Sequence, residues 1–283
     1  MKSILLPLTA QIETDSIARI SATLAGQFQA SLTGLFVRTD PRSAIPFMGE
    51  GLTADMIQTL CDGAEKQGCD QADKARAAFK EALEGSGVTW APEASTGARA
   101  SWTVVVGEIS DHVGRRARTA DVAICNSPCS KSPDAQDIFL ELIFRSGRSV
   151  LMVPENYRGT VGKHVMIAWN GRAEGARAVT GALPMLRDAQ KVTIVQVGDI
   201  GEDRPQLSAI AHYLAEHGIN AATQAIDAAE KSVGAVLLET AKSINADTLV
   251  LGAYSHSRWR EMVLGGVTKY VTNKSCLPVF MSH

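Results

Sequence analysis

Three glycines near the end of the chain have the spacing of a loop that could hold an anion. Gly252 ends a short apolar run, where the backbone must turn tightly, and Gly265 and Gly266 open a helical pattern. The free N–H groups and the positive dipole end at a helix N-terminus favour negatively charged oxygen. Further donors, and the first turn of that helix, are supplied by Ser255, His256, Ser257, Arg258, Val267 and Thr268. The chemistry indicated is phosphate binding, although a turn that only closes a strand–helix unit would leave the same glycines.

The elements that must position this loop belong to an internal repeat. Four buried-strand patterns recur in the same order in the two halves: residues 2–9 with 163–170, 31–37 with 191–197, 119–125 with 246–252, and 147–154 with 276–282. Amphipathic helical patterns separate them. Strands that are apolar at nearly every position and alternate with such helices predict a parallel sheet covered on both faces. The expected fold class is α/β, with two tandem doubly wound domains of five parallel strands each.

The domain boundary is expected in the polar stretch Glu155–Gly162, which gives domains at 1–157 and 158–283. The first domain carries additional chain around residues 41–85, a Pro- and Gly-containing loop followed by a long helical pattern. We interpret it as a helical insertion within the domain.

The strand ends locate the candidate site. In open α/β sheets ligands bind beyond the carboxyl ends of strands, where the strand order reverses. In the second half this places Ala168 and Asn170, at the end of its first strand, beside the glycine loop. The corresponding residues of the first half, Thr9 and Cys125, are followed by no comparable glycines.

The loop also carries a family resemblance. The loop has Gly252, two residues and Ser255, followed by nine further residues and Gly265. Together with the run Ser257–Thr268 and the Pro278-Val279 ending, this pattern resembles the universal stress protein family in its tandem two-domain form. The resemblance covers both halves and implies an adenine nucleotide alpha hydrolase-like fold. It further implies ATP or AMP bound in the second domain alone, at Ala168, Asn170, the backbone of Val197 and the loop 252–268. It implies antiparallel pairing of the last strands of the two halves, which makes one chain the equivalent of a dimer.

The chain departs from the family pattern at three site positions. Asn170 stands where the family has Asp, and it keeps an acceptor oxygen but loses the charge that strengthens hydrogen bonds from hydroxyls. Ser255 replaces a glycine at a position that favours positive φ, and Gly266 replaces a Ser or Thr, for which Thr268 is a partial substitute. In the first half Thr9 replaces the Asp, so we expect a degenerate, structural copy that binds no nucleotide.

Composition sets the remaining expectations. With 28 Lys and Arg against 30 Asp and Glu, the formal charge of −2 offers no broad surface for nucleic acid or anionic membrane. No apolar run is long enough to span a membrane, and five scattered cysteines suit reduced thiols, so a cytoplasmic location is expected. Cys125 and Cys129 lack further ligands for a metal site, and none is expected.

These patterns favour a regulatory or stress-response protein with no dedicated catalysis and at most slow, incidental ATP hydrolysis. A scaffold that binds protein partners and has lost both nucleotide sites is the main alternative. A second alternative is a nucleotide-dependent enzyme of the doubly wound class, although the chain has no Gly-x-Gly-x-x-Gly turn. The protein partner is unknown, and a further homodimer of whole chains stays open.

Overall fold

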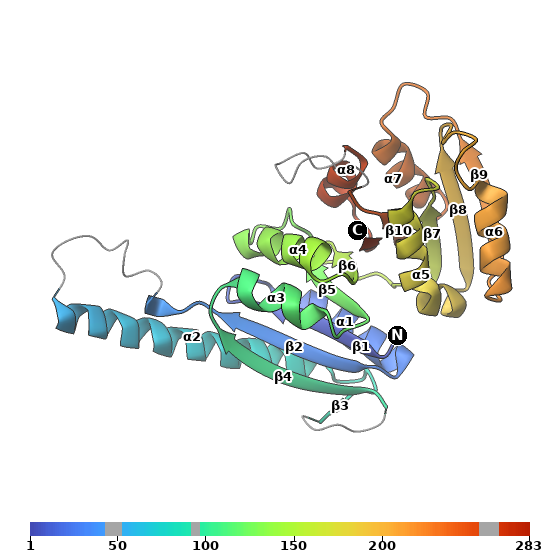
Figure 1. The fold of residues 1–283 in the computed structure, drawn as a ribbon. Helices are drawn as coiled ribbons and strands as arrows, with labels where there is room; N and C mark the ends of the chain where they lie inside the picture. Colours follow the sequence, from blue (N-terminus) through green and yellow to red (C-terminus); the bar gives the residue numbers. More distant parts are fainter. Residues whose placement is uncertain (43–52, 92–96, 255–265) are drawn as a thin grey trace.

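A computed structural model describes residues 1–42, 53–91, 97–254 and 266–283. In these residues, eleven strands form one continuous sheet in the order β3-β4-β2-β1-β5-β6-β11-β10-β7-β8-β9 (Figure 1). Helices alternate with the strands along the chain and cover both faces of the sheet. The α/β fold class predicted from the sequence is confirmed.

The first half supplies six of the strands. Its elements are β1 (Ser3–Leu8), α1 (Thr14–Phe28), β2 (Ser31–Arg38), α2 (Ala54–Ala82), β3 (Thr89–Trp90), β4 (Arg99–Val106), α3 (Ile109–Ala117), β5 (Val122–Asn126), α4 (Pro133–Arg145) and β6 (Ser149–Val153). The two-residue strand β3 lies outside the five strands expected for this half, and it pairs only with the beginning of β4.

The second half contributes five strands. Its elements are β7 (His164–Ala168), α5 (Ala173–Asp188), β8 (Lys191–Val197), α6 (Leu207–Glu216), β9 (Ala221–Ile226), α7 (Val233–Ser243), β10 (Thr248–Gly252), α8 (Gly266–Lys274) and β11 (Val279–Ser282). The strand order β11-β10-β7-β8-β9 mirrors β6-β5-β1-β2-β4 of the first half. The boundary proposed at residues 157 and 158 falls in the connection between β6 and β7.

The two halves join through the antiparallel pair of β6 and β11, as expected from the resemblance. Val279 lies opposite Met152, and Met281 opposite Val150. At one end of this seam the hydroxyls of Ser149 and Ser282 lie 2.9 Å apart and share a buried hydrogen bond. All other strand pairs are parallel, so the carboxyl ends of the strands meet at one edge of the sheet within each half.

In each half an aspartate holds the beginning of the first strand. It lies just before β5 in the first half and just before β10 in the second. Asp121 accepts hydrogen bonds from the backbone N–H groups of Lys2 and Ser3. Asp247, at the matching position, accepts from the backbone of Lys163 and His164 at 3.0 and 3.2 Å. This shared contact supports the internal repeat at the level of single residues.

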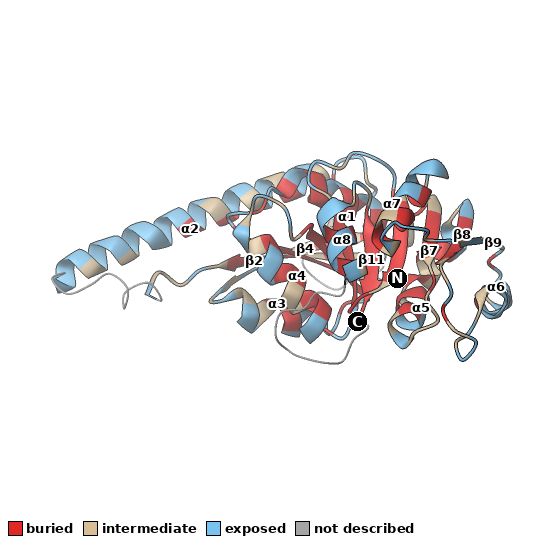
Figure 2. Ribbon diagram, turned by 90° about the horizontal axis from the view of Figure 1, so that it is seen from above, coloured by how far each residue is buried: buried red, intermediate tan, exposed pale blue. Residues whose placement is uncertain are grey.

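The insertion predicted in the first half contains the long helix α2. The Thr53 hydroxyl caps it by accepting from the backbone N–H of Met56 at 3.3 Å. Only Gly68, Ala72 and Phe79 of this helix are buried. Its first half projects beyond the sheet, whereas the buried residues elsewhere concentrate in the strands and on the helix sides that face them (Figure 2).

Candidate functional site

The site predicted in the second half lies at the carboxyl ends of β7 and β10, which are neighbours in the sheet. Ala168, the last residue of β7, pairs with Leu251, and Gly252 ends β10. Gly266 is the first residue of α8. The structure therefore brings together the ends of two strands and the beginning of a helix. Five of the predicted site residues lie outside the described part of the chain: Ser255, His256, Ser257, Arg258 and Gly265.

Gly252 is required by close packing and not by a left-handed turn, in contrast to the reason inferred from the sequence. A Cβ at this position would lie 2.4 Å from the backbone nitrogen of Gly175 and 2.7 Å from the carbonyl carbon of Glu174. Both atoms belong to the first turn of α5. The end of β10 and the beginning of α5 are therefore in direct backbone contact.

Tyr254, which follows β10 by two residues, has a left-handed backbone with φ of 57°. Its backbone N–H donates to the Thr268 hydroxyl at 3.3 Å, and Thr268 is 4% exposed. This bond ties the chain that leaves β10 to the first turn of α8. The Thr268 side chain, expected to stand in for a missing phosphate-binding hydroxyl, thus accepts a bond within the loop.

The beginning of α8 is open on its described side. Gly266 is exposed, and a Cβ there would meet no atom within 4 Å. Val267 is half-buried against the core. The first N–H groups of an α-helix have no partner within the helix, so a helix terminus of this kind can bind an anion.

The end of β7 is shaped by Trp169, which the sequence left unassigned. Its buried indole Nε1 donates to the carbonyl of Pro205 at 2.7 Å, so the chain that follows β8 folds over it. Gly171, with φ of 65°, lets the same segment approach, since a Cβ there would lie 2.7 Å from the Cβ of Arg204.

The predicted adenine and ribose contacts, Asn170 and Val197, flank this tryptophan. Asn170 Oδ1 accepts from the backbone N–H of Arg172 at 3.1 Å, just before α5 begins. Its acceptor oxygen therefore supports the local turn, and its amide N–H₂ is the group left for a ligand. Val197 ends β8 and is half-buried.

Tyr254 also links the site to the first half of the chain. Its ring centroid lies 4.6 Å from that of Phe144 on α4, and the ring of His283 packs edge-on against Phe144 at 5.0 Å. Burial raises the pKa of the Tyr254 hydroxyl to about 12. The buried Tyr254 oxygen has no hydrogen-bond partner in the described structure.

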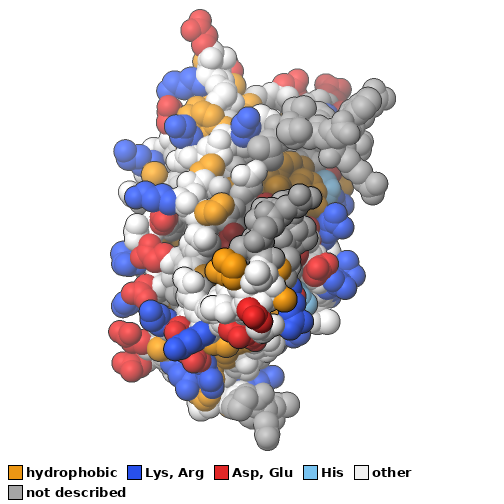
Figure 3. Space-filling view, turned by 90° about the vertical axis from the view of Figure 1, so that its left-hand side faces the viewer, with side chains coloured by type: hydrophobic (Ala, Val, Ile, Leu, Met, Phe, Trp, Pro, Cys, Tyr) orange, Lys and Arg blue, Asp and Glu red, His pale blue; other side chains and the backbone are white. Residues whose placement is uncertain are grey.

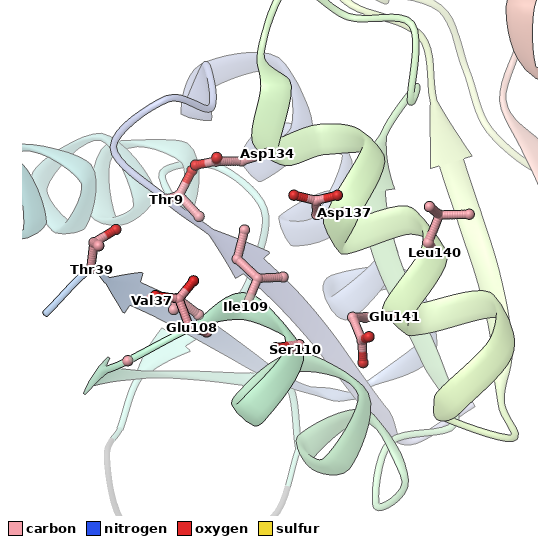
Figure 4. A pocket seen from close by; sticks show the side chains of 11 residues that line it. Thr9, Val37, Thr39, Glu108, Ile109, Ser110, Asp134, Asp137, Leu140 and Glu141 are labelled. Atoms are coloured by element: carbon pink, nitrogen blue, oxygen red, sulfur yellow. The ribbon is translucent and has the colours of Figure 1, made fainter. Parts of the chain in front are cut away.

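The first half contains a cavity of about 280 Å³ that the sequence did not predict (Figure 4). It lies at the carboxyl ends of β1, β2 and β4, between α3 and α4. Thr9 closes it at the end of β1, and Val37 and Thr39 at the end of β2. This is the position in the first half that corresponds to the candidate site in the second. The remaining lining residues are Gly107, Glu108, Ile109, Ser110, Asp134, Asp137, Leu140 and Glu141.

The cavity is acidic. Four of its lining side chains are carboxylates, and none of the lining residues is Lys or Arg. Burial raises the pKa of Glu141 above its ordinary value, Arg145 opposes that shift, and Asp137 adds to it. The spacing of Asp134, Asp137 and Glu141 places them on one face of α4, and this is the signal that sequence reasoning could have used.

In the described structure, no three side chains of His, Cys, Asp and Glu gather in an arrangement that could hold a metal ion. Cys125 is buried in β5, and burial raises the pKa of its thiol.

Among the described helices, none combines the length and apolarity needed to cross a membrane. On the face shown in Figure 3, basic and acidic side chains are interspersed.

The duplicated strand order and the antiparallel seam define a tandem doubly wound α/β protein. Residues 162–283 match the sequence model of the universal stress protein family. No curated protein sequence matches the chain.

Solved structures extend the fold comparison to the whole chain. A universal stress protein from Archaeoglobus fulgidus DSM 4304 is 15% identical, with a TM-score of 0.69 over 98% of this chain and 97% of the other. One from Pseudomonas aeruginosa UCBPP-PA14 is 14% identical, with a TM-score of 0.57 over 100% and 93%. A functionally unknown protein from Pseudomonas aeruginosa PAO1 is also 14% identical, with a TM-score of 0.56 over 98% and 92%. These likenesses show that both halves share the fold of these proteins.

Proposed function

We propose that this chain is a cytoplasmic stress-response protein whose second half binds an adenine nucleotide, ATP or AMP, as a regulatory ligand. The observation that carries the proposal is the bond between the Tyr254 N–H and Thr268. It fixes the chain leaving β10 against the beginning of α8, next to the end of β7. A strand end and an open helix N-terminus that converge at the switch point of a doubly wound sheet suit a phosphate group.

Each predicted residue then has a role in the proposed complex. The N–H groups at Gly266 and Val267 hold phosphate oxygens. The amide of Asn170 and the backbone of Val197 lie at the ends of β7 and β8, toward which the ribose and base extend. The contact of Gly252 with α5 keeps both strand ends at a fixed separation. Bound nucleotide acts by changing the state or the partners of the protein, and any hydrolysis is slow and incidental.

The first half is proposed to bind no nucleotide. Its cavity lies at the corresponding strand ends, but four carboxylates line it. Charges of one sign focused in a cleft repel a ligand of the same sign, and a triphosphate is strongly anionic. We therefore expect one nucleotide per chain.

Calorimetric titration with ATP and with AMP tests this proposal. The wild-type protein should bind one equivalent, and Thr268→Val, which removes the acceptor for the Tyr254 N–H, should weaken binding by about tenfold or more. Thr272→Val is the matched control, because Thr272 is equally buried on α8 and its hydroxyl bonds only to Lys269 of the same helix. Absence of heat with the wild type, together with no adenine nucleotide released on denaturation, contradicts the proposal.

A protein-binding scaffold is the second candidate, and specific contacts favour it. Asn170 Oδ1 is used by the turn before α5, and Trp169 fills space beyond the end of β7. Both contacts reduce what is left for a base and ribose. A wild-type protein that binds neither ATP nor AMP but is folded and stable would support this candidate. Phosphate release above the rate of slow background hydrolysis would instead favour an enzyme.

A further inference from the structure

The backbone of Tyr254 is held in an unfavourable conformation just beyond the end of β10. A left-handed backbone is costly for a residue that carries a Cβ, and Tyr254 has a φ of 57°. Two contacts keep it there. Its N–H donates to the Thr268 hydroxyl at 3.3 Å, and its ring packs against that of Phe144 with the centroids 4.6 Å apart. Only 8% of Tyr254 is exposed, so its side chain is well covered where the chain leaves the sheet.

Phe144 reaches Tyr254 from the other half of the chain. It lies in the last turn of α4, one residue before that helix ends, and 46% of it is exposed. A phenylalanine so far exposed adds little to the core of the first half. Its ring packs instead against two rings of the second half, those of Tyr254 and His283. Tilted and edge-on aromatic pairs attract each other beyond the area that they bury, so this side chain serves the contact between the halves.

A matching contact runs in the opposite direction between the two halves. In the internal repeat residues 119–125 align with 246–252, so Ser127 is the counterpart of Tyr254. The Ser127 hydroxyl donates to the carbonyl of Thr272, near the end of α8, at 3.0 Å, and this bond is buried. In each half, the chain that leaves β5 or β10 therefore contacts the last helix of the other half. The first half thus touches both elements that flank the candidate site of the second, the end of β10 and the helix α8.

We propose that the first half of the chain positions the candidate nucleotide site of the second half, with Phe144 as the main positioning residue. This inference rests on the proposed function, and it adds that nucleotide binding depends on the half that has no such site. Phe144 fixes the chain leaving β10 through the ring of Tyr254, and Ser127 fixes α8 through its last turns. Because both elements are fixed to the same body, the strand end and the beginning of the helix keep a constant separation.

Removal of the Phe144 ring has a specific consequence. Without that contact the Tyr254 backbone is free to leave the left-handed region, and its N–H then turns away from Thr268. The bond that ties the chain leaving β10 to α8 is lost. The buried side chains of both halves keep their neighbours, since Phe144 lies outside the core. The effect should therefore fall on the candidate site and not on overall folding.

Amide exchange of Tyr254 tests the positioning without any ligand. Selective ¹⁵N labelling of tyrosine resolves this amide by NMR, because the chain has only four tyrosines, and Tyr254→Phe assigns its signal. In Phe144→Ala the signal should shift and the amide should exchange faster by up to about tenfold, the factor that one aromatic pair contributes. Phe144→Tyr keeps the ring and should restore wild-type exchange. Tyr213→Ala is the matched control, because it removes a ring pair of similar spacing, with His217 at the end of α6.

Calorimetric titration of the same variants with ATP completes the test. Phe144→Ala should weaken binding by up to about tenfold, whereas Phe144→Tyr and Tyr213→Ala should stay within about twofold of the wild type. Ser127→Ala, which removes the hydrogen bond to α8, should weaken binding by about fivefold. Circular dichroism checks that every variant is folded.

The two measurements separate this inference from the proposed function. If the wild type binds ATP, but Phe144→Ala leaves either the affinity or the Tyr254 amide exchange at the wild-type value, the positioning role is overturned while nucleotide binding stands. Unchanged affinity in Ser127→Ala would likewise contradict it. If the wild type binds neither ATP nor AMP, the proposed function fails, and the amide exchange alone decides whether Phe144 positions Tyr254.

Discussion

Replacement of Gly252 by alanine tests whether close backbone packing is what requires a glycine at the end of β10. The new Cβ would lie 2.4 Å from the Gly175 nitrogen and 2.7 Å from the Glu174 carbonyl carbon. Non-bonded carbon and nitrogen atoms do not approach so closely, and both neighbours are backbone atoms, so α5 must shift. Overpacking of a close contact costs about 1–3 kcal/mol, and contact with backbone favours the upper part of this range.

This cost should lower the midpoint of thermal unfolding by roughly 4–12 °C, at about 2–4 °C for each kcal/mol in a domain of 150–250 residues. Gly266→Ala is the matched control, since α8 begins there in open space and no atom lies within 4 Å of the new Cβ. Alanine in the first turn of α8 should leave the midpoint unchanged or raise it slightly. Both midpoints follow from circular dichroism. If Gly252→Ala unfolds at the wild-type temperature, the close-contact explanation is wrong.

Three further predictions concern titratable groups. Tyr254→Phe should raise the free energy of unfolding in urea by up to about 1 kcal/mol, because it removes a buried hydroxyl that has no hydrogen-bond partner among the described residues. Since burial raises the Tyr254 pKa from 10.0 to about 12, wild-type stability should fall between pH 10 and 12, and the variant should lose less over that window. Glu141→Gln should stabilise the protein at pH 7, because the raised pKa of Glu141 makes its ionised form costly, and the gain should vanish below pH 4.5, where the carboxyl is protonated in both states. Cys125 should react with a thiol reagent only after unfolding, whereas Cys69 and Cys276 react in the native protein.

The architecture could be predicted from the sequence because burial and periodicity determine it. Runs such as residues 122–125 and 249–251 are apolar at every position, and only a sheet covered on both faces buries them. The antiparallel pairing of β6 and β11 came from the family resemblance, and the structure confirms it. The short strand β3 could not be predicted, since Thr89 and Trp90 have no period of their own and pair only because β4 lies beside them.

The candidate site was harder to predict because its geometry depends on contacts between distant segments. The sequence suggested positive φ at residue 255, which lies outside the described residues; its described neighbour Tyr254 has a φ of 57°, and its N–H is bound to Thr268 fourteen residues later. The reason for Gly252 lies in α5, which no pattern around residue 252 reveals. Likewise Trp169 depends on Pro205, which follows the next strand along the chain.

The two halves of the chain share the same frame and differ in their electrostatics. Asp121 and Asp247 hold the first strand of each half in the same way, so the strand ends that follow must converge at equivalent places. At that place α8 begins in the second half, whereas the first half presents carboxylates from α4 and from Glu108, just before α3. The helix α4 also carries Phe144, whose ring packs against Tyr254. A movement of Tyr254 would therefore also displace the helix that lines the acidic cavity. A difference of charge on a shared frame therefore gives one chain two unlike strand-end environments.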